Sequence, residues 1–408
     1  HCLNNYFNSY SKNDGICFVP HGMEHFLKQV SMKIGIEAQR IFREKKHGMD
    51  FVALELIKNL PSNENHEYFV FVNAKDAEID HNIFKQVTVV NTSLPYPIWE
   101  QLWLPKQAKK FNLDVLHCTA NTFPILNSVP TLLTLHDIIF MESNPLTNSD
   151  YSWYQRLGNY YRRLLVKNHL GKVNKIVTVS EYELNTMKKG LHTEGLDGKI
   201  SRIYNGVGEH FNAKELSQEH QVSLIAKYNL PKDFILFLGN TDPKKNTPNT
   251  LMAFAKFAKA NQGAHLVIGD LDQSFIDKCL PPETSPEVKN RIVSLGYIDN
   301  QDLPGLLKLA RVFLYTSLRE SFGIPLLEGM RCGTPVITSN TSSMPEIAKE
   351  AALLVDPLNV EDIANSSERL WNDKTLRAEF KKKGIARSAQ FNWSTMSIEY
   401  SRIYSQVA

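Results

Sequence analysis

Short apolar segments alternate with amphipathic segments along most of the chain, from Met32 onward. In the first half the short apolar segments predict strands. They are residues 33–38, 68–72, 87–90, 115–117, 131–135, 175–179 and 200–203. Helical patterns lie between several of them, for example at residues 51–60 and 153–167. Such an alternation of strands and helices predicts a parallel sheet that is covered on both faces.

The second half begins the same architecture again, although its sequence does not repeat the first half. Strands are predicted at residues 234–238, 265–268, 292–295, 312–315, 336–338 and 352–355. Helices are predicted between them at residues 250–259, 302–309, 325–331 and 345–350. A polar stretch at residues 212–230 is expected to form the surface connection between the halves. The last segment, residues 393–407, is predicted to be a helix capped near Asn392.

These patterns predict an α/β protein with two doubly wound, Rossmann-like domains that face each other across a cleft. We assign residues 32–212 to the N-terminal domain, residues 213–390 to the C-terminal domain and residues 391–408 to a final helix. Residues 1–31 lie outside this pattern, and we expect them to precede a natural start at Met32 or to be a loosely attached extension. Ligands of doubly wound sheets bind at the carboxyl ends of the strands, so we expect the site in the cleft.

Composition fits two globular domains and excludes several classes of protein. The 408 residues exceed what one ordinary core needs, and the hydrophobic (42%) and charged (22%) contents are close to the globular average. A net charge of +3 is too small to indicate nucleic-acid binding. Five scattered cysteines without a C-x-x-C pair favour a reducing, cytoplasmic compartment over a disulfide framework or a zinc site. No apolar run approaches the roughly 20 residues that span a bilayer, and residues 1–31 lack the apolar core of a secretion signal.

The most informative stretch is residues 319–336, RESFGIPLLEGMRCGTPV, which follows a predicted strand and enters a predicted helix. Pro325 suits the first helical position. The preceding loop, Glu320 to Gly323 with Ser321 and Phe322 between them, therefore lies at a helix N-terminus, where free N–H groups favour phosphate or sugar oxygens.

The same stretch holds two carboxylates, Glu320 in the loop and Glu328 in the early helix, from which both can reach one ligand. The alternative is that both carboxylates only stabilise the N-terminus of the helix through its dipole and bind no ligand.

The spacing Glu320-x7-Glu328 within this long string resembles the signature of the family 4 retaining glycosyltransferases of GT-B fold. The resemblance extends from Lys33 to about Tyr404. It implies a final helix that crosses back to the N-terminal domain. It also implies that Glu328 holds the ribose hydroxyls of a nucleotide and that Glu320 lies by the donor sugar, near the reacting carbon. Ser321 stands where the family usually has glycine, a departure that alters sugar contacts.

A second candidate element is the loop from Gly239 to Asn246, which follows a predicted strand and contains Lys244 and Lys245. Its ammonium groups suit a diphosphate and can stabilise the charge of a leaving group without a metal. The alternative is a solvated basic turn. The loop resembles the family's G-x-x-x-P-R-K-N element, which gives Lys245 the phosphate-binding role. Many relatives have arginine at the position of Asn240, and Lys244 is the candidate replacement.

Candidates in the N-terminal half rest on the same resemblance. Gly48 corresponds to the family's glycine loop opposite the donor phosphates, whereas Asp50 replaces a second glycine. His136 and Asp137 end a predicted strand and match the family's H-D at the sugar pocket. Read alone, a histidine at a strand end is more often structural. Asn205 belongs to an N-G-V element of the cleft, and its alternative is a tight turn.

The nucleotide base is expected at Tyr297 and Ile298, which the resemblance places against the base through their backbone groups. Two other nucleotide sites are excluded. No G-x-G-x-x-G follows a strand, and residues 195–199 lack the spacing of a P-loop.

Two further patterns have ordinary explanations. Asp270 and Asp272 form a D-x-D pair that we interpret as a loop, because GT-B enzymes generally bind no metal there. Residues 151–175 mix aromatic and basic side chains. We expect a packed helix with one apolar stripe and a solvated basic face, with a membrane-surface helix as the alternative.

The predicted reaction transfers a hexose-type sugar from a GDP-, UDP- or ADP-linked donor to a hydroxyl of a glycan or lipid-linked acceptor, with retention of the anomeric configuration. No metal or other cofactor is expected, and a role in polysaccharide or lipopolysaccharide synthesis is the family-level expectation. The alternatives are a nucleotide-sugar 2-epimerase, which needs no acceptor, and a two-domain sugar-binding protein of the periplasmic type, which needs a secretion signal.

Overall fold

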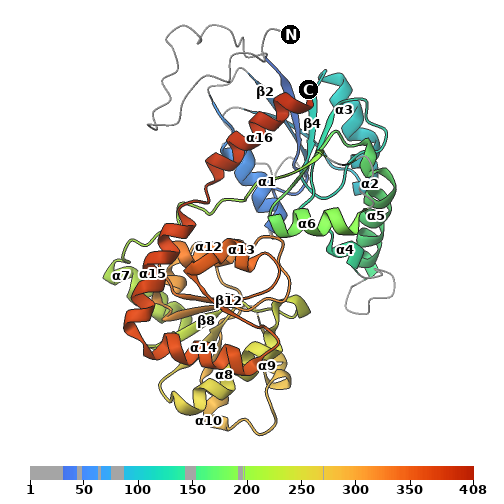
Figure 1. Ribbon diagram of the computed structural model, residues 1–408. Helices are drawn as coiled ribbons and strands as arrows, with labels where there is room; N and C mark the ends of the chain where they lie inside the picture. Colours follow the sequence, from blue (N-terminus) through green and yellow to red (C-terminus); the bar gives the residue numbers. More distant parts are fainter. Residues whose placement is uncertain are drawn as a thin grey trace, which may run out of the picture.

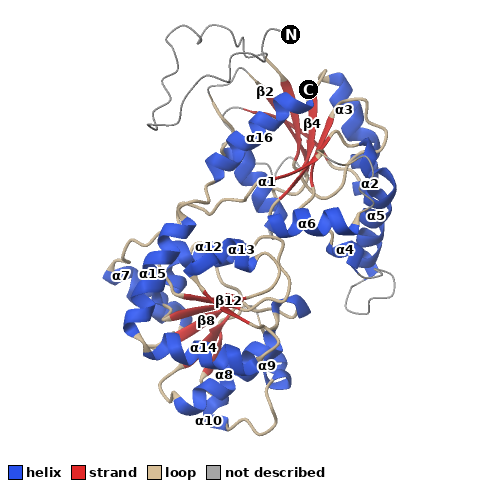
Figure 2. Cartoon of the chain, viewed as in Figure 1, coloured by secondary structure: helices blue, strands red, loops and turns tan. Residues whose placement is uncertain are grey.

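The computed structural model describes residues 31–43, 48–62, 66–74, 87–142, 153–191, 196, 198–269 and 271–408. The chain forms two separate sheets, each with helices on both faces, and the final helix runs beside the first sheet (Figure 1). Figure 2 shows the strands at the centre of each half and the helices around them. The predicted extension, residues 1–31, lies outside the described residues except for Ser31.

The N-terminal sheet has seven strands in the order β3-β2-β1-β4-β5-β6-β7. All of its paired strands are parallel. The strands are β1 Lys33–Glu37, β2 Glu67–Asn73, β3 Val87–Thr92, β4 Val115–Cys118, β5 Thr131–Thr134, β6 Lys175–Thr178 and β7 Ile200–Arg202. The order reverses between β1 and β4, as in a doubly wound sheet.

The C-terminal sheet has six parallel strands in the order β10-β9-β8-β11-β12-β13. The strands are β8 Phe234–Phe237, β9 His265–Ile268, β10 Ile292–Ser294, β11 Val312–Tyr315, β12 Val336–Ser339 and β13 Leu353–Val355. Its order reverses between β8 and β11, so the loops after these two strands lie at the place where such sheets bind ligands. Every predicted strand in both halves is confirmed within two residues at each end.

Helices cover both sheets. Those of the N-terminal half are α1 Gly48–Lys58, α2 Tyr96–Ile98, the π-helix Trp99–Trp103, α3 Leu104–Lys110, α4 Ile139–Glu142, α5 Trp153–His169 and α6 Glu181–Gly190. Those of the C-terminal half are α7 Gln218–Tyr228, α8 Thr247–Ala260, α9 Gln273–Cys279, α10 Pro286–Lys289, α11 Leu303–Leu309, α12 Ile324–Arg331, α13 Met344–Ala348, α14 Val360–Asn372 and α15 Lys374–Ser388, followed by α16 Trp393–Val407. Short 3-10 turns lie at Leu170–Lys172, Pro243–Lys245 and Lys349–Ala351.

Residues 212–230, the expected surface connection between the halves, are mostly exposed, but they contain a helix, α7, that the sequence pattern does not predict. Ser217 caps its start by accepting a hydrogen bond from the backbone N–H of His220. Leu224 is buried and packs so closely on α11 that a side chain at Gly305 would collide with it. A mostly polar helix that buries little of its surface has too weak an apolar pattern to be recognised in the sequence.

Helix α16 returns to the N-terminal sheet, as the resemblance implied (Figure 1). Asn392 caps its start, because its side chain accepts from the backbone N–H of Ser394 at 2.7 Å. The Tyr404 hydroxyl lies 2.9 Å from Nδ1 of His117, and the Tyr400 hydroxyl lies 2.9 Å from Oγ1 of Thr134. Buried polar groups of the sheet thus find their partners on the last helix, which ties the two halves together.

Helix α5 differs from the single packed stripe that was expected. Leu165 is buried, but Trp153, Leu157, Tyr160 and Leu164 expose 72%, 52%, 39% and 42% of their surfaces. These four residues recur at three- and four-residue spacing and so share one side of the helix, which we call the α5 apolar face. None of the helices in the described part of the chain combines the length and apolar character that a membrane crossing requires.

Candidate active site

The loop after β8 carries the first set of candidate residues. It begins at Gly239 and Asn240 and ends at Asn246, whose side-chain amide donates to the carbonyl oxygens of Thr316 at 3.0 Å and Pro357 at 2.6 Å. Asn246 adopts the left-handed conformation (φ 59°), which asparagine tolerates better than most residues. These buried hydrogen bonds fix the end of the loop against the loop that follows β11.

The ammonium of Lys245 lies 2.6 Å from a carboxylate oxygen of Glu320, and both side chains are more than four-fifths buried. The same ammonium lies 5.3 Å from the ring centroid of Tyr315, where the ring face attracts a cation. Lys244, by contrast, pairs with Asp242 at 3.3 Å and keeps 42% of its side chain exposed. The structure therefore pairs Glu320 with Lys245, whereas Lys244 adds to the positive charge around Glu320 without an ion pair to it.

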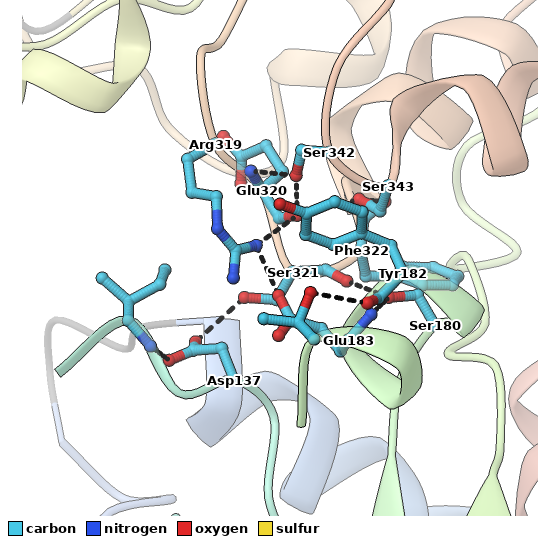
Figure 3. A network of polar contacts seen from close by, with 12 residues as sticks. Asp137, Ser180, Tyr182, Glu183, Arg319, Glu320, Ser321, Phe322, Ser342 and Ser343 are labelled. Carbon is cyan, nitrogen blue, oxygen red and sulfur yellow. Dashed lines mark hydrogen bonds and ion pairs between the residues drawn. The ribbon is translucent and has the colours of Figure 1, made fainter. Parts of the chain in front are cut away.

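The loop before α12 is held by two serines that follow β12 (Figure 3). The backbone N–H of Glu320 donates to Oγ of Ser342 at 2.9 Å. Oγ of Ser343 lies 3.0 Å from the carbonyl oxygens of both Glu320 and Phe322. Gly323 ends the loop with a φ of 95°, a conformation that suits glycine, and α12 begins at the next residue. The shape of the loop is therefore fixed by hydrogen bonds within the protein.

Glu328 lies on α12 near Tyr315, where burial and then the Glu328 charge raise the pKa of the tyrosine hydroxyl. No hydrogen bond or ion pair reaches its carboxylate within the described part of the chain, and burial raises its pKa to about 8. A mostly buried carboxylate that keeps its acceptor positions open is suited to hydrogen bonds from ribose hydroxyls.

Tyr297 and Ile298 follow β10, two strands away from β8. Tyr297 is 65% exposed, whereas Ile298 packs closely against Gly269 at the end of β9. Both positions lie at the carboxyl edge of the sheet that carries the Lys245–Glu320 pair.

His136 follows β5 and is almost fully buried. Its Nε2 lies 3.0 Å from the carbonyl oxygen of Thr119, and its backbone N–H donates to Oδ1 of Asn121 at 2.7 Å. Because a carbonyl oxygen only accepts, Nε2 carries the proton and Nδ1 is left as an acceptor. Burial lowers the pKa of His136, so the neutral ring is suited to a hydrogen bond with a sugar hydroxyl.

Asp137 links the two domains. Its Oδ2 accepts a hydrogen bond from the Ser321 hydroxyl at 2.9 Å, and its Oδ1 accepts from the backbone N–H of Ile139 at 3.2 Å (Figure 3). The position at which the sequence departs from the family's usual glycine therefore makes a direct contact between the N-terminal and C-terminal candidates.

Two predicted residues lie apart from this group. Gly48 is the first residue of α1, and nearby Asp50 is buried in an ion pair with Arg40 at 3.4 Å. Asn205 is buried beside Gly206, whose α-carbon packs on the backbone of Trp393 where the chain crosses between the halves. In the described residues neither Gly48 nor Asn205 is hydrogen-bonded to the other candidates.

Asp270 of the D-x-D pair lies outside the described residues, which contain no cluster of metal-ligating side chains.

The sequence analysis missed the residues that join the domains around this site. Arg319 forms ion pairs with Glu183 and with Glu142, the latter at 3.0 Å, and its guanidinium lies 4.8 Å from the ring centroid of Tyr182. Glu346 accepts hydrogen bonds from two backbone N–H groups at the start of α6. Arg319 stands directly before Glu320 in the most informative stretch, but nothing in the sequence indicates its partners.

Two facing α/β domains with the carboxyl ends of their strands at a common interface define a GT-B protein. Residues 47–210 match the family described as Glycosyltransferase Family 4, and residues 223–387 match the one described as Glycosyl transferases group 1. The chain belongs to this glycosyltransferase family, and the predictions of family and fold are confirmed. The assigned domain boundaries and site roles stay predictions.

Relatives and solved structures agree with this assignment. The O-antigen chain mannosyltransferase B of Escherichia coli is 30% identical over 56% of this chain and 67% of its own length. The serotype-specific mannosyltransferase WbdA of Escherichia coli is 28% identical over 65% of this chain, which spans about a third (32%) of that longer protein. The fold resembles that of HepE from Anabaena in complex with UDP-glucose, with a TM-score of 0.68, 17% identity and coverage of 92% of this chain and 100% of HepE.

Proposed function

We propose that this chain transfers a hexose from a nucleoside diphosphate sugar to a hydroxyl of a glycan or lipid-linked acceptor, with retention of the anomeric configuration. The observation that carries the proposal is the buried Lys245–Glu320 pair at the ends of β8 and β11, with Glu328 close by. The names of the relatives make mannose the first sugar to test, and the UDP-glucose complex of HepE makes UDP the first nucleotide. GDP and ADP remain candidates, and polysaccharide or lipopolysaccharide synthesis is the proposed setting.

In the proposed reaction the acceptor oxygen attacks the anomeric carbon on the face from which the diphosphate departs. The bond between that carbon and the diphosphate oxygen breaks, and the acceptor's proton moves to the departing oxygen. Lys245 stabilises the negative charge that develops there, so that no metal is required. Glu320 orients the sugar, Glu328 holds the ribose, and Nδ1 of His136 accepts from a sugar hydroxyl. No side chain acts as a nucleophile in this scheme.

A thermal-shift experiment tests the donor site. A nucleotide that binds the folded protein raises its melting temperature by mass action. UDP, GDP and ADP are compared on the parent chain, on Glu328→Ala and on Glu368→Ala, which removes an exposed carboxylate from α14. We expect one nucleotide to stabilise the parent and Glu368→Ala but not Glu328→Ala. If no nucleotide stabilises the parent at millimolar concentration, the proposed donor site is wrong.

We also propose that the α5 apolar face rests on an anionic membrane surface at the cytoplasmic side, where a lipid-linked acceptor lies. Three cations, Arg156, Arg163 and Lys167, project from one flank of this face, which complements anionic headgroups. An exposed tryptophan and tyrosine suit the interface between lipid and water.

Co-sedimentation with vesicles tests this contact. The parent is expected to bind vesicles that contain phosphatidylglycerol more strongly than pure phosphatidylcholine vesicles. The double variant Leu157→Ser/Leu164→Ser should lose most of that binding. The matched control, Val222→Ser/Ile225→Ser, removes two exposed apolar side chains from α7 and should retain it. Equal loss in both double variants, or no binding by the parent, contradicts a membrane role for α5.

A further inference from the structure

The first turn of α6 is one place where hydrogen bonds join the two domains. Glu346, from α13 of the C-terminal domain, accepts from the backbone N–H groups of Glu181 at 2.8 Å and Tyr182 at 3.0 Å. Free N–H groups at a helix N-terminus favour a carboxylate, so this contact is stabilising although it crosses between domains. The hydroxyl of Tyr204 donates to the same carboxylate at 2.7 Å.

The N-cap of α6 also holds the donor loop. Ser180 accepts from the backbone N–H of Glu183 at 3.1 Å, which caps the helix. The same hydroxyl donates its proton to the carbonyl oxygen of Ser321 at 2.7 Å (Figure 3). One hydroxyl thus satisfies the helix and fixes the backbone of the loop that contains Glu320.

Arg319 adds charge to this contact. Its guanidinium donates to the carboxylate of Glu183, to Glu142 at 3.0 Å and to the carbonyl oxygen of its neighbour Glu320 at 3.2 Å. It also covers the ring of Tyr182 (Figure 3). The Glu183 side chain is completely buried, and a buried carboxylate that loses its partner is strongly destabilising. Loss of the Arg319 guanidinium while the domains stay in contact would leave that carboxylate buried without its partner.

Three successive residues therefore have different tasks in one loop. Arg319 and Ser321 contact the N-terminal domain, while Glu320 between them contacts Lys245 of the C-terminal domain. The loop cannot keep all of these contacts if the domains move apart.

We propose that Arg319 is a positioning residue that couples domain closure to the placement of Glu320. Its pairing with Glu183 and Glu142 fixes the donor loop in its transfer-competent position only when the two domains are in contact. The inference rests on the proposed function, since it assigns Glu320 to the donor sugar. A plain stability role for the ion pair is the alternative that the experiment must separate.

The experiment compares Arg319→Gln with Arg311→Gln in the full chain. Arg311 pairs with Asp233 at 3.3 Å and stacks on Trp371, all within the C-terminal domain. It is therefore a matched control for the loss of an arginine ion pair. The measurements are the dissociation constant of the nucleotide identified by thermal shift, and kcat and donor KM for transfer to methyl α-mannoside.

We expect Arg319→Gln to bind the nucleotide within about twofold of the parent and to lose kcat on the order of tenfold to a hundredfold, because a small misplacement of a reacting group is costly. Arg319→Lys should recover part of kcat, since it keeps the charge but not the fork of donors. Arg311→Gln should match the parent in both quantities. An unchanged kcat in Arg319→Gln, or a nucleotide affinity as weak as that of Glu328→Ala, overturns the proposal.

Small-angle X-ray scattering without ligand gives a second readout that does not depend on the proposed reaction. Arg319→Gln should have a larger radius of gyration than both the parent and Arg311→Gln. If the parent binds no nucleotide but this difference appears, the proposed function fails while Arg319 still holds the domains together. If the three radii agree, Arg319 does not control closure.

Discussion

The donor side and the acceptor side of the proposed site are built in different ways. On the C-terminal side, Lys245 and Glu320 come from the loops after two adjacent strands, β8 and β11, and form a charged pair. On the N-terminal side, His136 is buried and neutral, and its hydrogen bonds go to the backbone and side chains of its own domain.

This difference matches the chemistry that each side is proposed to perform. A diphosphate carries its own negative charge, so its site needs fixed cations and backbone donors before the ligand arrives. A sugar hydroxyl is neutral, and a buried neutral imidazole can bind it without the cost of burying a charge. On the proposed assignment, the donor side stabilises charge, whereas the acceptor side supplies shape and hydrogen bonds.

The largest expected effect comes from Lys245→Ala. Removal of the cation from the proposed leaving-group site should lower kcat by about 10² to 10³, the usual cost of losing one such stabilising group. Lys244→Ala is the control, because the Lys244 ammonium pairs with Asp242 and not with Glu320, and its side chain is 42% exposed. Steady-state kinetics with the identified donor give both values. If kcat falls equally in the two variants, Lys245 has no special role at the leaving group, and the donor side is not built around the Lys245–Glu320 pair.

The strands of both domains could be predicted from the sequence because parallel strands buried on both faces appear as short apolar runs. The segment that forms β8, FILF, is completely buried, and its uninterrupted apolar run predicts a strand. Helix α7 was missed because its sequence, QEHQVSLIAKY, offers mostly polar residues around a single buried Leu224. The apolar pattern therefore predicts elements that are buried on most of their surface, such as β8, better than a polar helix that buries a single side chain against its neighbour, such as α7.

The two sides of the site also differed in how far the sequence could predict them. Glu320 and Glu328 are separated by seven residues in one stretch, so a single motif contains both. The partners of Arg319 lie in α4 and α6, more than 130 residues away, and their proximity depends on how the domains meet. Local sequence carries no signal for such a contact, and the Ser321–Asp137 hydrogen bond was unpredictable for the same reason.

An intermediate effect is expected in the pH dependence of nucleotide binding. Burial raises the pKa of Glu328 to about 8, so the free protein carries a proton on this group at neutral pH. Ribose hydroxyls that donate to the carboxylate favour its ionised form, and binding therefore releases that proton. Affinity should rise with pH by up to about tenfold per unit below pH 8 and then level off.

Isothermal titration calorimetry at pH 6.5, 7.5 and 8.5 measures this dependence. Glu328→Gln is the control, because it keeps the shape but cannot titrate, and any remaining slope belongs to the phosphates of the nucleotide. If the parent and Glu328→Gln show the same slope, Glu328 does not hold the ribose in its ionised form.

The smallest expected effect comes from Ser321→Gly, which restores the residue usual in the family. The change removes the hydrogen bond of 2.9 Å between the Ser321 hydroxyl and Asp137 and leaves Asp137 with the backbone N–H of Ile139. A hydrogen bond to a charged group contributes about 1.5–3 kcal/mol, but this contact lies at a partly exposed interface, and we expect the lower end, about a tenfold effect. It should appear in donor KM, with nucleotide affinity unchanged, since the hydroxyl faces the acceptor domain rather than the base. A loss of nucleotide affinity instead would show that the Ser321–Asp137 contact acts on nucleotide binding and not on the placement of the sugar.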